Sequence, residues 1–266
     1  MIFTDQTGRS IRLDSPPRRI ISLVPSQTEL LFDLGLDEEV VGITKFCVHP
    51  KGKWRTKPRV GGTKQLDFEK IDALKPDLIL GNKEENDRSQ IEQLQALYPV
   101  WMSDIITLDD ALGMIRSVGG MTETAEKATK LAHQISAAFQ SGVQSKAPKI
   151  SVAYLIWYRP WMAVASGTFI DSMLAAGGFT NVFADKARYP EITLAELAAA
   201  RPEAILLSSE PFPFREKHFK EIQQLCTSAV VKQVDGELFS WYGSRMLKAA
   251  PYLASLHDEL AASLKS

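Results

Sequence analysis

The sequence lacks the features that mark several large classes of protein. Its 266 residues include only two cysteines, which excludes a disulfide-dense scaffold. Lys and Arg number 31 against 32 Asp and Glu, so the chain has no overall basic excess of the kind that nucleic-acid binders use. No run approaches the roughly 18 apolar residues of a membrane span. Hydrophobic residues make up 45% of the chain, which is typical of a globular protein of one large or two modest domains.

The N-terminus and the two cysteines bear on the cellular compartment. The first residues, Met1–Arg9, contain no basic segment followed by an apolar one, which is the pattern of a secretory signal. On this evidence the chain either stays in the cytoplasm or has lost a leader. Cys47 and Cys226 lie far apart in the sequence, and we expect both to be unpaired thiols.

The chain contains two similar stretches at an offset of 126 residues, which aligns Pro76 with Pro202. Residues 67–84 and 193–210 each read as a short helix, a proline stop and an apolar strand. A second pair, 26–35 and 168–177, opens on a hydroxyl residue and ends in a helix-stop glycine. In the first member of that pair, Ser26 and Glu29 form a capping-box pattern. Any two αβ units share some of this, but two matches in the same order favour a duplicated architecture.

The alternation of strands and helices predicts the fold class. Short apolar runs predict buried strands, and the segments between them show helical spacing. Strands are expected at 19–24, 40–43, 77–80, 100–102, 150–155, 204–208 and 229–234, and helices at 26–34, 67–74, 86–97, 168–176, 193–200 and 215–225. We therefore expect an α/β protein of two similar lobes with mostly parallel sheets.

One long helix is expected to join the two lobes. The segment from Thr122 to about Gln144 has no Gly or Pro until Gly142, and its apolar residues fall at helical spacing. We predict a rigid connector, with an N-terminal lobe at 1–120, the connecting helix at 121–146 and a C-terminal lobe at 147–266. The alternative, an ordinary surface helix within a single domain, stays open.

Motifs for catalysis are absent: the sequence has no G-x-S-x-G elbow, P-loop or H-E-x-x-H. His133, His218 and His257 lie in expected helices with polar neighbours, so we expect them to be solvated. Cys47 and His49 make at most half of a zinc site. We predict no enzyme activity, no catalytic residues and no metal ligands.

Aromatic residues gather in two loop-like stretches, around Trp157 and around Trp241. Loops are usually polar, so rings there suggest contact with a large flat ligand, with core packing as the alternative. Arg245 lies beside the second group and could meet carboxylate, phosphate or amide oxygens. Loops at the carboxyl ends of parallel strands converge on ligands, which adds the Pro25–Ser26 turn to the candidates.

The residues 18–30 (RRIISLVPSQTEL), 41–44 (VGIT) and 74–80 (LKPDLIL) resemble successive units of a known family. This is the class III periplasmic substrate-binding proteins of ABC importers, the helical-backbone metal-chelate receptors. The motifs 166–168 (SGT) and 241–245 (WYGSR) are similar to motifs of its C-terminal lobe, and 4–9 (TDQTGR) resembles its opening hairpin. The resemblance covers nearly the whole chain, and its pattern is nearest to the cobalamin binders.

The resemblance implies a function and further residues. It implies a binding protein that captures a metal chelate in a shallow interlobe cleft and delivers it to an ABC permease. A cobalt corrinoid is preferred, a ferric siderophore or haem is the alternative, and no covalent cofactor is implied. Phe46 matches an aromatic position of the B12 binders, whereas Thr63 and Asn82 replace tryptophans. The candidate ligand-binding residues are therefore Pro25, Ser26, Phe46, Thr63, Asn82, Trp157, Tyr158, Trp161, Trp241, Tyr242 and Arg245.

The resemblance also implies one permease-docking glutamate per lobe, for which Glu69 and Glu210 are the candidates. It implies a monomer in the periplasm or another extracytoplasmic space, with no nucleic acid partner and no membrane span. Two other hypotheses stay open on the sequence. One is a cytoplasmic two-lobed enzyme or chaperone that acts on a tetrapyrrole or its metal, which the missing signal would suit. The other is a protein–protein adaptor without a small ligand.

Overall fold

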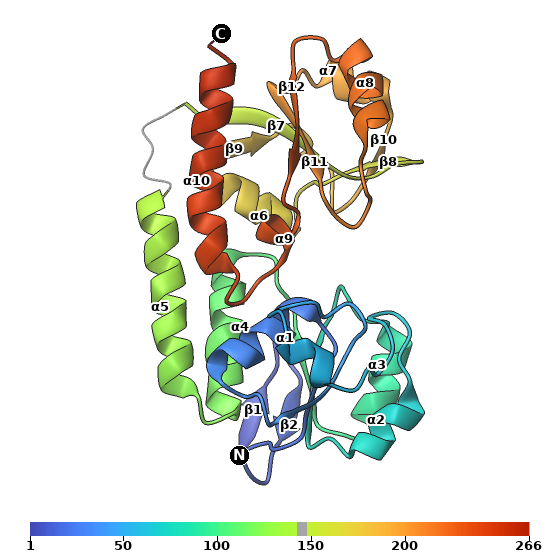
Figure 1. Cartoon of the computed structure of the whole chain (residues 1–266), viewed down its shortest axis with the longest axis vertical. Helices are drawn as coiled ribbons and strands as arrows, with labels where there is room; N and C mark the ends of the chain where they lie inside the picture. Colours follow the sequence, from blue (N-terminus) through green and yellow to red (C-terminus); the bar gives the residue numbers. More distant parts are fainter. Residues whose placement is uncertain (143–147, 266) are drawn as a thin grey trace. The chain divides into compact units, whose positions relative to one another are not determined.

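The computed structural model describes residues 1–142 and 148–265 and divides into two compact α/β units (Figure 1). Unit 1 consists of Met1–Ile105, Asp109–Ile135 and Trp241–Arg245, and unit 2 of Ile106–Leu108, Ser136–Ser240 and Met246–Ser266. The segment Trp241–Arg245, expected in the C-terminal lobe, thus belongs to unit 1.

Unit 1 is built on a four-stranded parallel sheet in the order β4-β3-β5-β6. Its central strands are buried on both faces, which is why they read as continuous apolar runs in the sequence. The sheet strands are β3 (Ile20–Ser22), β4 (Val40–Ile43), β5 (Leu78–Asn82) and β6 (Val100–Ser103). The helices are α1 (Pro25–Leu34), the 3-10 helix η1 (Lys53–Thr56), α2 (Phe68–Leu74), α3 (Arg88–Gln95), most of α4 (Leu108–Met121) and the first part of α5 (Ala125–Gly142). A small antiparallel hairpin of β1 (Ile2–Thr4) and β2 (Ser10–Arg12) precedes them.

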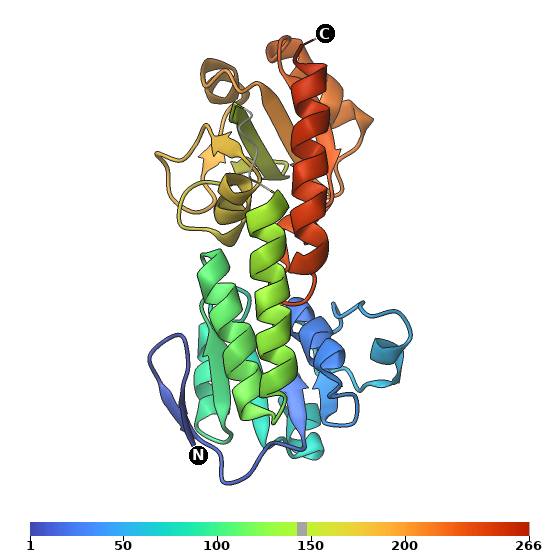
Figure 2. The ribbon, with the colours of Figure 1, turned by 90° about the vertical axis from the view of Figure 1, so that its left-hand side faces the viewer.

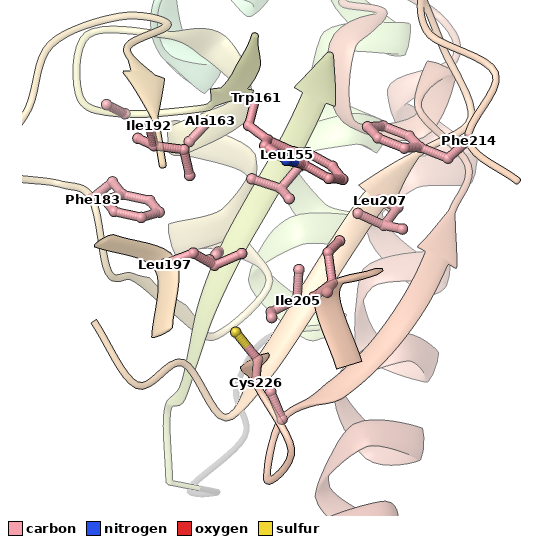
Figure 3. Packing of buried hydrophobic residues seen from close by; sticks show 14 residues of the cluster. Leu155, Trp161, Ala163, Phe183, Ile192, Leu197, Ile205, Leu207, Phe214 and Cys226 are labelled. Atoms are coloured by element: carbon pink, nitrogen blue, oxygen red, sulfur yellow. The ribbon is translucent and has the colours of Figure 1, made fainter. Parts of the chain in front are cut away.

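Unit 2 carries a six-stranded mixed sheet in the order β10-β8-β7-β11-β12, with β9 also paired to β7. Its strands are β7 (Ile150–Trp157), β8 (Trp161–Ala163), β9 (Phe179–Asn181), β10 (Glu191–Ile192), β11 (Ala204–Ser208) and β12 (Val230–Val234). Its helices are α6 (Phe169–Ala176), α7 (Leu194–Ala199), α8 (Glu216–Leu225), α9 (Glu237–Ser240) and α10 (Met246–Ser263). A cluster of buried side chains packs on β7 and β11, with Leu155, Ile205 and Leu207 at its centre (Figure 3).

The two sheets repeat one arrangement, which confirms the α/β fold of two similar units. In unit 2 the parallel strands lie in the order β9-β7-β11-β12, and in unit 1 they lie in the order β4-β3-β5-β6. In both sheets the first two of these strands along the chain lie in reversed order, and the third and fourth strands follow on the other side of the first. The bounds of β5 and β11 differ by the 126 residues found in the sequence. Lys75 and Arg201, each directly before the aligned proline, also share a left-handed backbone, with φ of 45° and 47°.

The helix expected over about 122–144 is observed as α5, Ala125–Gly142, and the following residues 143–146 of the expected connector lie outside the described residues. Two long helices were missing from the expected elements, α4 and α10. Helix α10 continues through Pro251, a residue that normally ends a helix. In Figure 2 the unit 1 parts of α4 and α5 lie side by side. Within residues 1–142 and 148–265, the structure contains no helix that is both long and apolar enough to span a membrane.

Candidate ligand-binding site

In unit 1 the candidate site lies where the order of the sheet reverses. The chain leaves β3 through α1 toward β4 and then crosses to β5 on the other side of β3. In open parallel sheets, ligands bind outside the carboxyl ends of the strands at such a switch point. Pro25 and Ser26 form the first turn of α1 directly after β3, and Asn82 ends β5. Three predicted residues therefore occupy the edge at which this kind of sheet binds ligands.

The first turn of α1 differs from the expected capping box. The N-cap residue is Val24, its side chain makes no capping hydrogen bond, and the first turn contains no acidic residue. Ser26 is buried two residues after the N-cap position, and Glu29 pairs with Arg245, so the capping-box prediction is wrong. The backbone N–H groups of this turn thus have no side-chain acceptor from a cap, and the positive end of the helix dipole lies here.

Asn82 is buried, and its amide is committed to the fold of unit 1. Its Nδ2 donates to the carbonyl and hydroxyl of Ser103, at 3.3 and 3.0 Å. Its Oδ1 accepts from the backbone N–H groups of Glu84 and Glu85, at 2.8 and 3.0 Å, and so closes the turn after β5. Thr63 is half-buried, and its carbonyl accepts from Asn86. Both residues shape the loops at this edge through hydrogen bonds within unit 1.

Arg245 forms a buried ion pair inside unit 1. Its Nε and Nη2 donate to the two carboxylate oxygens of Glu29 at 2.8 and 2.9 Å, and both side chains are at least nine-tenths buried. The guanidinium carbon also lies 4.7 Å from the centre of the Trp241 ring, which in turn meets the His49 ring edge-on at 5.4 Å. Two of the five Arg245 donors are thus engaged by a carboxylate from α1. This fixes the segment Trp241–Arg245 onto unit 1.

Tyr242 is also buried in unit 1, and its hydroxyl donates to the Glu85 carboxylate at 2.9 Å. Burial raises the pKa of Tyr242 well above its usual value, and the neighbouring Glu85 charge raises it further. The phenol therefore stays protonated and acts as a donor. Glu29, Glu85 and His49 complete the surroundings of this segment. No local sequence pattern marks them as partners, because each lies more than 150 residues from the residue it contacts.

Phe46 is the exposed aromatic residue of the loop that follows β4. Half of its surface is accessible, at 51%, and the Lys45 ammonium lies 5.1 Å from its ring centre. The base of this loop is held against α1, because the buried Cys47 thiol contacts the hydroxyls of Thr28 and Thr44. Burial raises the pKa of Cys47, and both cysteines are free, as predicted. An exposed ring on an anchored loop is suited to stacking on a flat ligand.

In unit 2 the three predicted aromatic residues belong to a larger ring cluster. Trp161 is buried, and its ring stacks at 9° on Phe214 in the core of unit 2 (Figure 3). Tyr158 packs edge-on against Trp161 at 4.8 Å, and its hydroxyl donates to Glu221. Trp157, the last residue of β7, is 39% exposed and meets Phe212 edge-on. Of the three, Trp157 presents the most ring surface, and Trp161 occupies a core position.

Two histidines that we expected to be solvated are buried. His218 packs among Tyr158, Trp161, Phe212 and Phe214, and its Nδ1 accepts from the backbone N–H of Arg215. Burial lowers the pKa of His218 below its usual value. His257 on α10 packs against Phe179. The prediction of solvated side chains is wrong for both because their helices present these positions inward, and it is confirmed for His133.

The two glutamates predicted to dock a permease differ in their surroundings. Glu69 is exposed on the first turn of α2. Glu210 is half-buried after β11, and its carboxylate accepts from the Ser240 hydroxyl at 3.0 Å. It lines an open hollow of about 590 Å³ with Asp235 and Glu237. Among the residues described, no group of three or more His, Cys, Asp or Glu side chains is placed to hold a metal ion.

Comparisons with known proteins agree with one another. The family model described as periplasmic binding protein matches residues 20–234. The vitamin B12-binding protein of Pectobacterium carotovorum subsp. carotovorum (strain PC1) is 26% identical over 245 residues, which cover 90% of this chain and 88% of that protein. The vitamin B12-binding protein of Vibrio cholerae serotype O1 is 27% identical over 198 residues, covering 73% and 71%.

Solved structures share the fold. The periplasmic vitamin B12 binding protein BtuF of Vibrio cholerae superposes with a TM-score of 0.79 at 21% identity, covering 92% of this chain and 98% of that one. The periplasmic heme-binding protein RhuT from Roseiflexus sp. RS-1 superposes with a TM-score of 0.80 at 23% identity, covering 92% and 99%. At such identities these structures show a common fold and leave the ligand open.

Proposed function

The chain belongs to the periplasmic binding protein family, and from that premise we propose that it is the substrate-binding protein of an ABC importer for a metal chelate. Its relatives in this family are substrate-binding proteins and not enzymes, as the sequence predicted. The proposed ligand is a cobalt corrinoid, with a ferric siderophore or haem as the other members of the same class. It is held without covalent bonds and passed to a permease in the membrane.

One observation carries this proposal: large aromatic rings are left accessible on the loop after one parallel strand and at the end of another. Phe46 follows β4 of unit 1, and Trp157 ends β7 of unit 2. A macrocyclic chelate offers broad apolar faces, and burial of an aromatic ring against such a face is favourable by area alone. The names of the curated relatives support a corrinoid, and the haem-binding structural neighbour supports a tetrapyrrole of another kind.

The roles of the remaining predicted residues follow from their surroundings. Trp241, Tyr242 and Arg245 support the unit 1 edge from within, and Pro25 and Ser26 bring the start of α1 to it. Glu69 is exposed enough to meet a basic residue of the permease, and Glu210 is the proposed counterpart in unit 2. We further propose that the protein works as a monomer outside the cytoplasm, where an importer collects its substrate.

The proposal is tested by calorimetric titration of the purified protein with cyanocobalamin, a ferric siderophore and haem. We expect saturable one-to-one binding of at least one of the three, with the F46A variant binding more weakly and remaining as stable as the parent. A matched control is L97A, since Leu97 is also an exposed apolar residue of unit 1, outside the proposed site. Absence of heat with all three ligands would contradict the proposed function.

A further inference from the structure

The loop between β4 and α2 has a charge unlike that of the chain as a whole. Residues 44–66 contain no Asp or Glu, although the complete chain balances 31 basic against 32 acidic residues. The basic residues of this stretch are Lys45, Lys51, Lys53, Arg55, Lys57, Arg59 and Lys64. A single segment thus concentrates positive charge in a protein that is close to neutral.

Most of this charge is left without a carboxylate partner. Of the seven basic side chains, only Lys53 forms an ion pair within the described residues, with Asp37 at 2.8 Å. Arg59 donates to the carbonyl of Thr44 at 3.0 Å and Lys64 to that of Glu84 at 2.6 Å, and Lys57 likewise donates to a carbonyl. A carbonyl satisfies a donor but does not cancel its charge.

The loop combines these charges with aromatic surface. The Lys45 ammonium lies over the exposed Phe46 ring, and Val48 beside it is 40% exposed. Further along, the guanidinium carbons of Arg55 and Arg59 lie 5.3 and 4.7 Å from the centre of the Trp54 ring. The exposed Phe46 ring and the half-buried Trp54 ring, both bordered by cations, fit a ligand that has a flat apolar body and anionic groups at its rim.

The position of the loop ties this surface to the proposed binding edge. Ile43, the last residue of β4, donates its backbone N–H to the carbonyl of Pro58 and accepts from the N–H of Val60, and Cys47 is held against Thr28 of α1. The start of the loop, Lys45–Cys47, therefore stands at the carboxyl end of β4, near the uncapped first turn of α1, which adds the positive end of a helix dipole. Arg59, whose guanidinium lies over the Trp54 ring, donates to the Thr44 carbonyl at the same end of β4, whereas Lys53 pairs with Asp37 beyond the C-terminal end of α1. Both features favour an anion at this edge.

We propose that this basic loop makes the protein selective for chelates that carry anionic groups on a planar macrocycle. The inference rests on the proposed function and narrows its ligand class to carboxylate-bearing tetrapyrroles and corrinoids. Lys45 and Arg55 are the selecting residues, because they are exposed and are not bound to a carboxylate. Loops of this composition also attach to anionic membranes, so the test includes that surface.

The test uses two pairs of probes. The members of each pair have the same macrocycle and differ in the negative charge of their side chains. Zinc protoporphyrin IX is compared with its dimethyl ester, and a carboxylate derivative of cyanocobalamin, made by hydrolysis of side-chain amides, with cyanocobalamin itself. Binding is measured by fluorescence quenching at low and high salt. We expect the acid form of at least one pair to bind about tenfold more tightly at low salt, with the ratio falling as salt screens the charges.

Two double variants locate the effect. In K45Q/R55Q the preference for the acid form is expected to fall at least threefold. In the control R116Q/K130Q, which removes one exposed Arg and one exposed Lys from α4 and α5 of the same unit, it is expected to persist. Equal affinity for the acid and neutral forms would overturn this inference, and so would an equal loss of the preference in both double variants. Neither result would contradict the proposed function.

Two further outcomes complete the test. Flotation with vesicles containing phosphatidylglycerol is expected to show no attachment. If the parent protein attached to the vesicles, K45Q/R55Q did not, and the protein bound acid and neutral chelates equally, the inference would be overturned. The basic loop would then be a membrane-binding surface. If none of the four probes bound but the calorimetric titration showed binding of a ferric siderophore, this inference would fail and the proposed function would stand. If the siderophore did not bind either, the proposed function itself would fail, and this inference with it.

Discussion

At the scale of single residues, Arg245 holds the segment Trp241–Arg245 to unit 1 through a bidentate, buried ion pair with Glu29. Its residue type and its position beside Trp241 and Tyr242 suggested a ligand contact. The structure instead gives it a buried carboxylate partner, Glu29, which lies 216 residues away. No local pattern encodes such a pairing, because it depends on how the chain returns to unit 1. Phe46, a candidate through the family resemblance, is exposed, and Trp157 is partly exposed although it is the last residue of β7 and not a loop residue.

The Glu29–Arg245 pair predicts a large effect of one substitution. R245Q removes the charge that compensates a buried carboxylate, so the free energy of unfolding should fall by about 3–5 kcal/mol. The matched control is R88Q, which breaks an exposed pair with Glu92 on α3 and should change stability little. Urea unfolding followed by circular dichroism measures both. Equal stability of R245Q and R88Q would show that the pair does not support unit 1.

The two tryptophans of unit 2 should separate binding from stability. W161A leaves a cavity in the core beside Phe214 and should lower the free energy of unfolding by about 3–5 kcal/mol. W157A removes a partly accessible ring and should leave the fold intact while weakening the Kd for the chelate about tenfold. Thermal unfolding and ligand titration of both variants give the comparison. A W157A protein that binds normally would remove Trp157 from the proposed site.

At the scale of elements, the sequence predicted most strands and helices of the duplicated core. Apolar runs bounded by turn residues and proline stops are local signals, and β5 and β11 carry them at the same spacing. The elements that were missed depend on tertiary context. The short antiparallel strand β8 exists through pairing with β7, and β10 exists through pairing with β8. Helix α10 continues through a proline because its inward face packs on unit 2.

The contact between α4 and α5 offers a prediction at this scale. A Cβ atom at Gly119 would lie 2.2 Å from the Cβ of Ala128, whereas one at Gly120 would meet nothing within 4 Å. G119A should therefore force the helices apart and cost about 1–3 kcal/mol of unfolding free energy. G120A should instead stabilise α4 by about 0.5–1 kcal/mol, because glycine is a poor helix former. Chemical denaturation of the two variants should give opposite signs, and a destabilised G120A would refute this description of the contact.

At the scale of the whole molecule, the family and the repeated α/β architecture were predictable from the sequence, and the ligand was not. The strands of the two sheets and the repeat at an offset of 126 residues follow from signals spread over the entire chain, whereas the order β4-β3-β5-β6 was not predicted and comes from the structure. Ligand identity depends instead on a few side chains at the strand ends, several of which are engaged within their own unit. The basic loop 44–66 is the strongest indication of ligand specificity in the sequence. The balanced charge of the complete chain conceals it.

The central claim is that this protein captures an intact metal chelate and does not transform it. Native mass spectrometry of the protein, incubated with equal amounts of cyanocobalamin, zinc protoporphyrin IX and a ferric siderophore, tests it most directly. We expect one dominant complex of one protein chain with one unaltered chelate, and denaturation should release a chelate of the same mass. Only unliganded protein, or a chelate whose mass has changed after incubation, would contradict it.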